Sequence, residues 1–273
     1  MRNTIRNWWA SFTRRARMPN SHRPTLEGLE QRSLQAGSFM ASIPMAELRG
    51  MMMSAQTTAT VGFASTTTLN GRFVDRVYRD LLGRTVDPTG LAFWTGMLAQ
   101  GVSREQVVMG IENSPEFRAD VVENLFMRFL GRQADLMGLN TFTTFLANGG
   151  TVEQVEEAIT SSTEFFRRRG NGTNDGFVNA LFQNALNRPV DPVGRATFDR
   201  ALASGATRAQ VATAVFASPE FRQDLVEGFF ESFLNRAADS SGLNTFTGLL
   251  QQGARDETVI ADIVGSAEFF ARP

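Results

Sequence analysis

The sequence predicts an all-α fold of tandem three-helix units, arranged as two duplicated blocks after a disordered N-terminal region. Apolar residues recur at helical spacing from residue 73 onward, and no segment of useful length alternates polar and apolar residues as a strand would. Four segments of 46 residues also align without gaps, which is typical of repeat proteins. These units span residues 73–118, 121–166, 177–222 and 225–270.

The units follow an A-B-A-B order. Unit one matches unit three at 20 of 46 positions, and unit two matches unit four at 23, which indicates that a two-unit block was duplicated. A polar, glycine-bearing segment separates the blocks and predicts a linker. The expected domains are a disordered basic and export-signal region with a linker (1–70), helical block one (71–166), a linker (167–176) and helical block two (177–273).

The first helix of each unit is predicted from apolar residues that share one helical face. In unit one these residues are Phe73, Val74, Val77, Tyr78, Leu81 and Leu82. We expect the helix to stop at a residue that tolerates the left-handed conformation. The four stop residues are Gly83, Gly131, Asn187 and Asn235.

The second helix opens with Asp87-Pro88 in unit one and Asp191-Pro192 in unit three. Aspartate accepts backbone N–H groups at a helix N-cap, and proline is favoured at the first helical position. The inner face is predicted to hold Leu91, Trp94 and Leu98. Glycines end this helix in every unit, at Gly101, Gly149, Gly205 and Gly253.

The third helix has a capping-box signature in three units, with Ser or Thr followed three residues later by Gln. The cap residues are Ser103, Thr151 and Thr207. Unit four has Arg255 at this position, so Asp256 is the expected cap. The segment Ser114-Pro-Glu116 then predicts a fresh cap and a helix that runs directly into the next unit.

Three charged residue types recur at fixed positions in every unit, and they admit two interpretations. They are Arg84, Arg132, Arg188 and Arg236; Asp87, Asp135, Asp191 and Asp239; and Glu116, Glu164, Glu220 and Glu268. They could form a ligand or ion site in each unit. We expect instead a structural role, in which arginine ties a turn to nearby carboxylates or carbonyls. The pairs Phe165-Phe166 and Phe269-Phe270 are likewise expected in the core rather than at an exposed docking point.

Composition excludes several kinds of site. The chain has no cysteine and one histidine, His22, so thiolate and histidine-based sites are not expected. Residues 71–273 carry a net charge of −6, which disfavours nucleic acid as a partner. No uninterrupted apolar run is long enough for a membrane span. The segment Asn171–Asp175 offers oxygen ligands with a single charge and lacks the pattern of a calcium loop. No catalytic, cofactor-binding or metal-ligating residue is assigned, no cofactor is expected, and the binding residues are unknown.

The first 70 residues differ from the repeats. Residues 1–23 hold six arginines, no acid, and the aromatic residues Trp8, Trp9 and Phe12, which fits a membrane-surface or targeting segment as well as a disordered basic tail. The segment Leu26–Leu34 resembles the N-terminal export motif of many planctomycete proteins. The matching residues are Leu26, Glu27, Leu29, Glu30, Arg32 and Leu34, while Gly28 and Gln35 depart from it. This resemblance implies export.

The repeat itself resembles bacterial domain of unknown function 4214. The pattern runs from Tyr78-Arg through Leu81-Leu-Gly-Arg84, Asp87, Gly90-Leu91 and Trp94 to Gly101 and Ser114-Pro-Glu-Phe117. Units two to four replace the tryptophan by Phe142, Phe198 and Phe246. The resemblance implies a module of exported or cell-surface proteins without an established activity. It also implies a distant similarity to the phycobilisome linker domain, and hence a protein-binding scaffold.

The sequence therefore predicts an exported, non-enzymatic interaction or scaffold protein whose partner is a protein or a cell-envelope component. This interpretation expects a continuous helical rod. A surface-associated hydrolase or glycan-active protein is the alternative, and it would need a cleft with two carboxylates about 5–10 Å apart. A calcium-stabilised secretion accessory module is the third possibility.

Overall fold

The computed structural model describes residue 66 and residues 68–272, and every regular element within them is helical, as predicted. The predicted N-terminal region and its export motif lie almost entirely outside the described residues. The helices of block one are α4 (Leu69–Leu82), α5 (Pro88–Ala99), α6 (Arg104–Glu112), α7 (Pro115–Leu130), α8 (Leu136–Ala147), α9 (Val152–Ser161) and α10 (Thr163–Arg168). Those of block two are α11 (Asn174–Ala185), α12 (Pro192–Ala203), α13 (Arg208–Phe216), α14 (Pro219–Phe229) with the π-helical turn η2 (Phe230–Leu234), α15 (Ser240–Gln251), α16 (Asp256–Gly265) and α17 (Ala267–Ala271).

Local signals in the sequence position most helix ends correctly. The four predicted stop residues have positive φ angles, with φ of 64° at Gly83 and 54° at Asn235. Aspartate is the N-cap of each second helix, and the three predicted capping boxes are present. The helices α7 and α14–η2 each join two units, as the fresh caps at Ser114 and Ser218 predict.

The predicted cap at Asp256 is wrong. Arg255 occupies the N-cap position without a side-chain cap bond, and Asp256 is the first helical residue, 5% exposed. The guanidinium of Arg255 donates hydrogen bonds to the carbonyls of Gly149 and Gly150, each at 3.0 Å. The side chain of Arg255 thus contacts the loop between α8 and α9 of unit two, and the carboxyl of Asp256 is buried.

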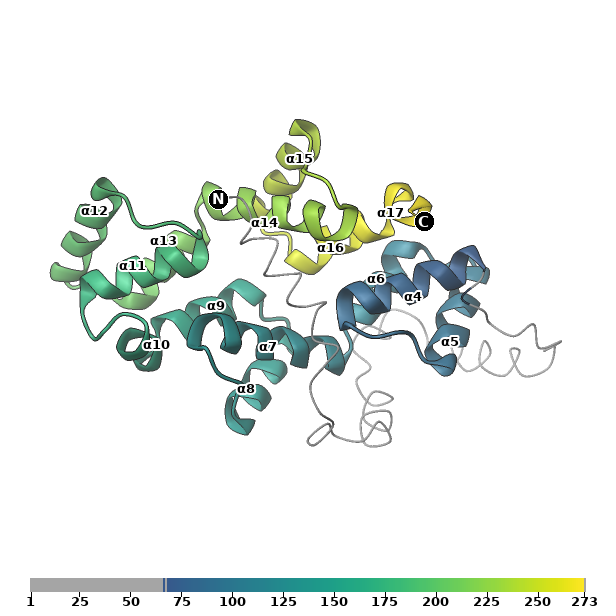
Figure 1. Ribbon diagram of the computed structural model, residues 1–273, viewed down its shortest axis with the longest axis horizontal. Helices are drawn as coiled ribbons and strands as arrows, with labels where there is room; N and C mark the ends of the chain where they lie inside the picture. Colours follow the sequence, from purple (N-terminus) through teal and green to yellow (C-terminus); the bar gives the residue numbers. More distant parts are fainter. Residues whose placement is uncertain (1–65, 67, 273) are drawn as a thin grey trace.

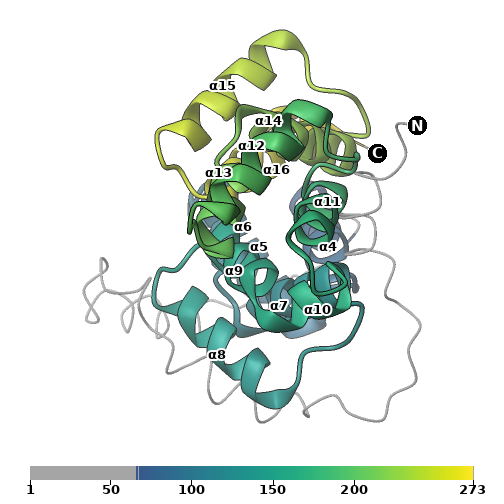
Figure 2. The same cartoon turned by 90° about the vertical axis from the view of Figure 1, so that its left-hand side faces the viewer.

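The four units close into a ring rather than an extended rod. Figure 1 shows the chain passing from α4 through α7, α11 and α14 back to α17, which lies beside α4. The third helices make the contacts between units two and three (α9 with α13) and between units four and one (α16 with α6). The second helices bury at most one residue each, and Figure 2 shows α8 and α15 projecting from the ring. We call α5, α8, α12 and α15 the outer helices.

Two junctions between units are built alike. In the inner junction, α9 and α10 of unit two pack on α11 and α13 of unit three; in the closing junction, α16 and α17 of unit four pack on α4 and α6 of unit one. A residue of block one corresponds to the residue 104 positions later in block two. Phe177 and Phe165 lie edge to face at 6.2 Å between ring centroids, and Phe73 and Phe269 do so at 6.1 Å.

Arginine contacts at the two junctions are equivalent as well. Arg208 lies over the ring of Phe166 at 4.5 Å, and Arg104 lies over Phe270 at 4.6 Å. Each of these arginines also donates from Nε to a carbonyl at the end of the opposing third helix, at 3.1 Å and 2.8 Å. Phe165 and Phe269 are fully buried, and Phe166 and Phe270 are partly buried against the core, so the prediction that the pairs belong to the core is confirmed in full for the first member of each pair and in part for the second.

The predicted linker between the blocks forms a packed turn between α10 and α11. Gly170 is buried, and a Cβ on Gly176 would lie 2.1 Å from the carbonyl oxygen of Gly170. Arg169 donates from Nε to the carbonyl of Phe129 at 2.8 Å. The segment therefore connects the blocks while contacting α7 of unit two.

Candidate functional site

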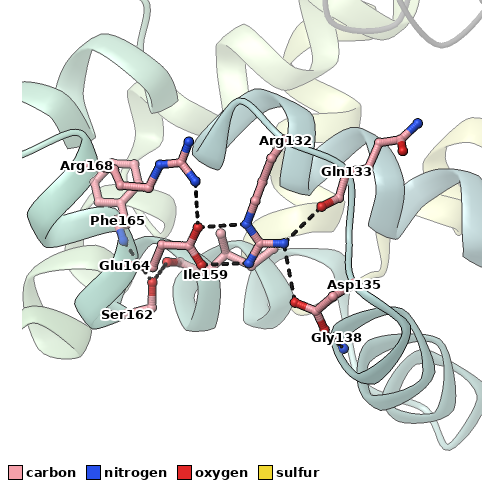
Figure 3. Close-up of polar contacts among 9 residues, drawn as sticks. All are labelled: Arg132, Gln133, Asp135, Gly138, Ile159, Ser162, Glu164, Phe165 and Arg168. Carbon is pink, nitrogen blue, oxygen red and sulfur yellow. Dashed lines mark hydrogen bonds and ion pairs between the residues drawn. The ribbon is translucent and has the colours of Figure 1, made fainter.

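The recurring arginine of each unit forms a clamp, shown for unit two in Figure 3. Arg132 lies in the turn that follows α7. Its Nε and Nη2 donate to the two carboxylate oxygens of Glu164 at 2.7 and 2.6 Å. Its Nη1 donates to the carbonyl of Gln133 at 2.9 Å and to Asp135 Oδ2 at 3.3 Å. One guanidinium thus joins the turn, the next helix cap and the end of the unit.

The clamp recurs in every unit with nearly the same geometry. The arginine Nε lies 2.5–2.7 Å from a glutamate that is 32 residues further along the chain. The guanidinium also covers an aromatic ring of the preceding helix, at 4.9–5.2 Å from the ring centroid. The covered rings are those of Tyr78, Phe126, Phe182 and Phe230.

The aspartate and the glycine after it complete the clamp. Asp135 Oδ1 accepts the N–H of Gly138 at 2.8 Å, which caps α8. A Cβ on Gly138 would lie 2.8 Å from Cζ of Phe126, so the ring occupies the space of a side chain. Gly242 stands in the same relation to Phe230. In units two and four the glycine thus makes room for the aromatic ring, in unit one a Cβ on Gly90 would meet the Tyr78 hydroxyl at 2.8 Å, and in unit three the nearest atom to a Cβ on Gly194 is Cγ2 of Val190 at 3.2 Å.

The charges of the clamp are satisfied within the chain. The hydrogen bonds from Arg132 hold the pKa of Glu164 below its usual value, and the N–H of Gly138 does the same for the pKa of Asp135. The carboxylates are therefore ionised at neutral pH and already paired. A ligand anion would have to displace Glu164 to reach the arginine. The arrangement matches the structural role expected for this residue set.

The described residues offer no grouping of three or more His, Cys, Asp or Glu side chains suited to a metal ion. In the segment considered for calcium, the carboxylate of Asp175 is paired with Arg195, and Asn171 and Gly172 form a left-handed turn. Within residues 68–272, no helix combines the length and the apolar character needed to cross a bilayer.

Sequence reasoning missed a group of buried and partly buried acids contributed by α6, α9 and α16. We call Glu112, Glu153, Glu156, Asp256 and Glu257 the central acid cluster. Glu112 is 3% exposed and Glu156 is 1% exposed. Burial raises the pKa of Glu156 to about 8, although Arg128 Nη1 lies 3.2 Å from its carboxylate. The signal in the sequence was the loss of the capping pattern at Arg255-Asp256 in unit four.

Exposed apolar residues on the outer helices were also missed. Leu136 and Met137, at the start of α8, are 75% and 78% exposed, and Val193 at the start of α12 is 76% exposed. Phe93 of α5 and Phe145 of α8 are partly exposed as well. Side chains of this size gain free energy when a partner removes them from water. The sequence signal was available, because an apolar pair directly after the cap aspartate occurs in unit two and a pair of serines stands there in unit four.

The comparisons with known proteins agree with the repeat. The family model described as Domain of unknown function (DUF4214) matches four segments, residues 50–121, 118–169, 156–225 and 223–272. No curated protein and no solved structure matches the chain. The matches follow the four units one by one and together cover most of the sequence. The chain therefore belongs to the DUF4214 family, as a tandem array of its domain.

Proposed function

We propose that this chain is a non-enzymatic interaction scaffold that binds a protein or a cell-envelope component through its outer helices. The observation that carries the proposal is the pair Leu136 and Met137, both at least three-quarters exposed at the start of α8. The recurring charged residues, in contrast, are paired with one another inside each unit. We therefore assign partner binding to exposed apolar residues and not to the charged residues that recur in every unit.

Variation among the units supports this assignment. The two positions after the cap aspartate are Leu136-Met137 in unit two, Pro192-Val193 in unit three and Ser240-Ser241 in unit four. All three pairs begin a helix of twelve residues with the same aspartate cap. The fold therefore accepts both apolar and polar residues here, so the apolar pair of unit two is not needed to build the helix.

We also propose that the protein acts after export, at the cell surface or outside the cell. Support comes from the resemblance of Leu26–Leu34 to the planctomycete export motif and from the settings in which the repeat family is found. The distant similarity to the phycobilisome linker domain supports protein binding without implying a pigment. The localisation is tested by fractionating cells that express either the wild type or a variant with Arg32→Ala and Leu34→Ala in the motif. Retention of both forms in the cytoplasm would contradict it.

The binding test compares variants that the chain itself suggests. Leu136→Ser with Met137→Ser copies the residues of unit four onto unit two, so α8 should still form. Because the chain contains no lysine, amine cross-linkers have almost no targets, and a photoreactive residue at exposed Asn140 of α8 is used instead. We expect wild type to cross-link a defined partner in intact cells and the double-serine variant to lose it.

A matched control separates binding from folding. Val193→Ser removes an equally exposed apolar side chain from α12, and it should leave the partner of α8 unchanged. Far-ultraviolet circular dichroism and the melting temperature of all variants should equal those of wild type. A double-serine variant that folds and still captures the same partner would overturn the assignment to α8.

A further inference from the structure

The closing junction has buried carboxyls at two positions where the inner junction is apolar. At one position the reverse holds, because Glu156 of α9, which is paired with Arg128, stands in place of Ile260. Glu112, the last residue of α6, stands where the inner junction has Phe216, which is 3% exposed. Asp256, the first residue of α16, stands where the inner junction has Val152, which is 7% exposed. Two apolar side chains of one junction are thus replaced by two carboxyls in its counterpart.

These carboxyls lack the partners that an ionised buried acid needs. Both side-chain oxygens of Glu112, and Oδ1 of Asp256, are buried without a hydrogen-bond partner. The side chain of Asp256 shares a hydrogen bond with that of Glu153 in α9. Because an ionised carboxylate can only accept hydrogen bonds, two carboxyls bond to each other only when one of them holds a proton. Burial without partners therefore favours the protonated form of these acids in the closed ring.

Charged side chains of the neighbouring helices face the two buried carboxyls. Glu112 faces Arg255 and Glu257 at the start of α16. Asp256 faces Glu153 and Glu156 of α9 as well as Glu257 of its own helix. The arginines already hold other partners: Arg255 binds Glu257 and two carbonyls, Arg128 of α7 binds Glu156 and the carbonyl of Asn184, and Arg118 of α7 binds the carbonyl of Asn113.

The closing junction also has no covalent link. At the inner junction the chain itself passes from α10 to α11. At the closing junction, Arg76 of α4 donates to the carbonyls of Phe269 and Arg272 at 2.9 and 2.6 Å, and the equivalent residue at the inner junction is Ala180. The chain itself therefore keeps the helix pairs of the inner junction close together, whereas only non-covalent contacts hold those of the closing junction.

We propose that the closing junction is a proton-dependent latch, shut while Glu112 and Asp256 are protonated and opened when they ionise, while the inner junction stays shut. Ionisation in the closed ring would leave buried carboxylates unpaired, which is strongly unfavourable. Opening returns both groups to water, where they ionise at ordinary acidic pH. The open form thus binds fewer protons, and a rise in pH favours it.

Spin labels on matched cysteine pairs test the latch, since the chain has no cysteine of its own. One pair, at Asn113 and Ala267, spans the closing junction. The other, at Ala217 and Thr163, occupies the equivalent exposed positions of the inner junction. At pH 5.5, pulsed electron paramagnetic resonance should give narrow distance distributions for both pairs. At pH 9, the closing pair should lengthen and broaden while the inner pair keeps its distance.

Two outcomes would overturn the proposal: an unchanged closing pair at pH 9, or equal changes at both junctions. A second variant keeps the test decisive. The double variant Glu112→Gln, Asp256→Asn removes both charges and keeps the side chains nearly the same shape. The distance distribution of the closing spin-label pair should then stay narrow at pH 9. Glu105→Gln, which removes a less buried carboxyl of the same helix, should open as wild type does. Opening of the double amide variant at pH 9 would show that other groups control the junction.

Discussion

At the scale of single residues, the clamp arginine joins parts of the chain that are distant in sequence. Arg132 and Arg236 are 29% and 37% exposed, so their ion pairs lie between the exposed and the buried case. We expect Arg132→Ala and Arg236→Ala each to reduce the free energy of unfolding by about 1–2 kcal/mol, which lowers the melting temperature by about 2–8 °C. Calorimetry measures this. Partner capture well below the melting temperature should persist, and its loss at unchanged stability would make the arginines a recognition site.

The clamp glycine gives a second test, with a control in another outer helix. Gly138→Ala places a Cβ 2.8 Å from Phe126, whose ring is held beneath Arg132, and should destabilise the protein by about 1–3 kcal/mol through overpacking. Gly248→Ala in α15 meets nothing within 4 Å and should stabilise by about 0.5–1 kcal/mol, because alanine favours a helix over glycine. Urea denaturation compares the two. If Gly138→Ala left the free energy of unfolding unchanged, the close approach of Phe126 would not be the reason for glycine at this position.

At the scale of elements, α4 and α17 meet without a covalent link, and Arg76 holds them together. Arg76→Ala removes two charge-assisted hydrogen bonds and restores the residue found at the inner junction. We expect the melting temperature to fall by a few degrees and the closing spin-label pair to broaden at a lower pH than in wild type. Arg72→Ala on the same helix serves as the control. If Arg76→Ala left both readouts unchanged, these hydrogen bonds would not hold the junction.

Helix boundaries were predictable from the sequence because the signals that set them are local. Asp87 with Pro88, or Ser103 with Gln106, satisfies backbone groups within four residues. The cap at Asp256 failed because Arg255 is held by Gly149 and Gly150, more than a hundred residues away. The clamp was predicted as a turn-binding arginine, but its glutamate lies 32 residues further on, and only the packed unit shows that they meet. Ring closure depends on equally distant contacts.

At the scale of the whole molecule, two sets of carboxyls give stability opposite dependences on pH. Burial raises the pKa of Glu112 and Asp256 and sets those of Asp80 and Asp224 at about 6. Their folded-state pKa values exceed the unfolded ones, so this stability is fully present below about pH 4 and is lost as pH rises through the folded values.

The clamp carboxylates act in the opposite direction. Arginine hydrogen bonds lower the pKa of Glu164, Glu220 and Glu268, so their contribution is present above about pH 4.3 and is lost as pH falls through their folded values. We therefore expect the melting temperature to be highest near pH 5 and to fall towards both pH 3 and pH 9. Calorimetry over this range measures it, and a melting temperature that rises from pH 5 to pH 9 would contradict the account.

Closure of the ring is tested most directly by cross-linking two engineered cysteines across the closing junction. Arg104→Cys with Phe270→Cys replaces two residues in contact there, and Arg208→Cys with Phe166→Cys replaces the equivalent pair at the inner junction. With a short bis-maleimide in dilute solution at mildly acidic pH, both pairs should cross-link within one chain, at similar rates and without dimers. Intramolecular cross-linking of the inner pair alone would show that the units form an open array and that the closed ring is wrong.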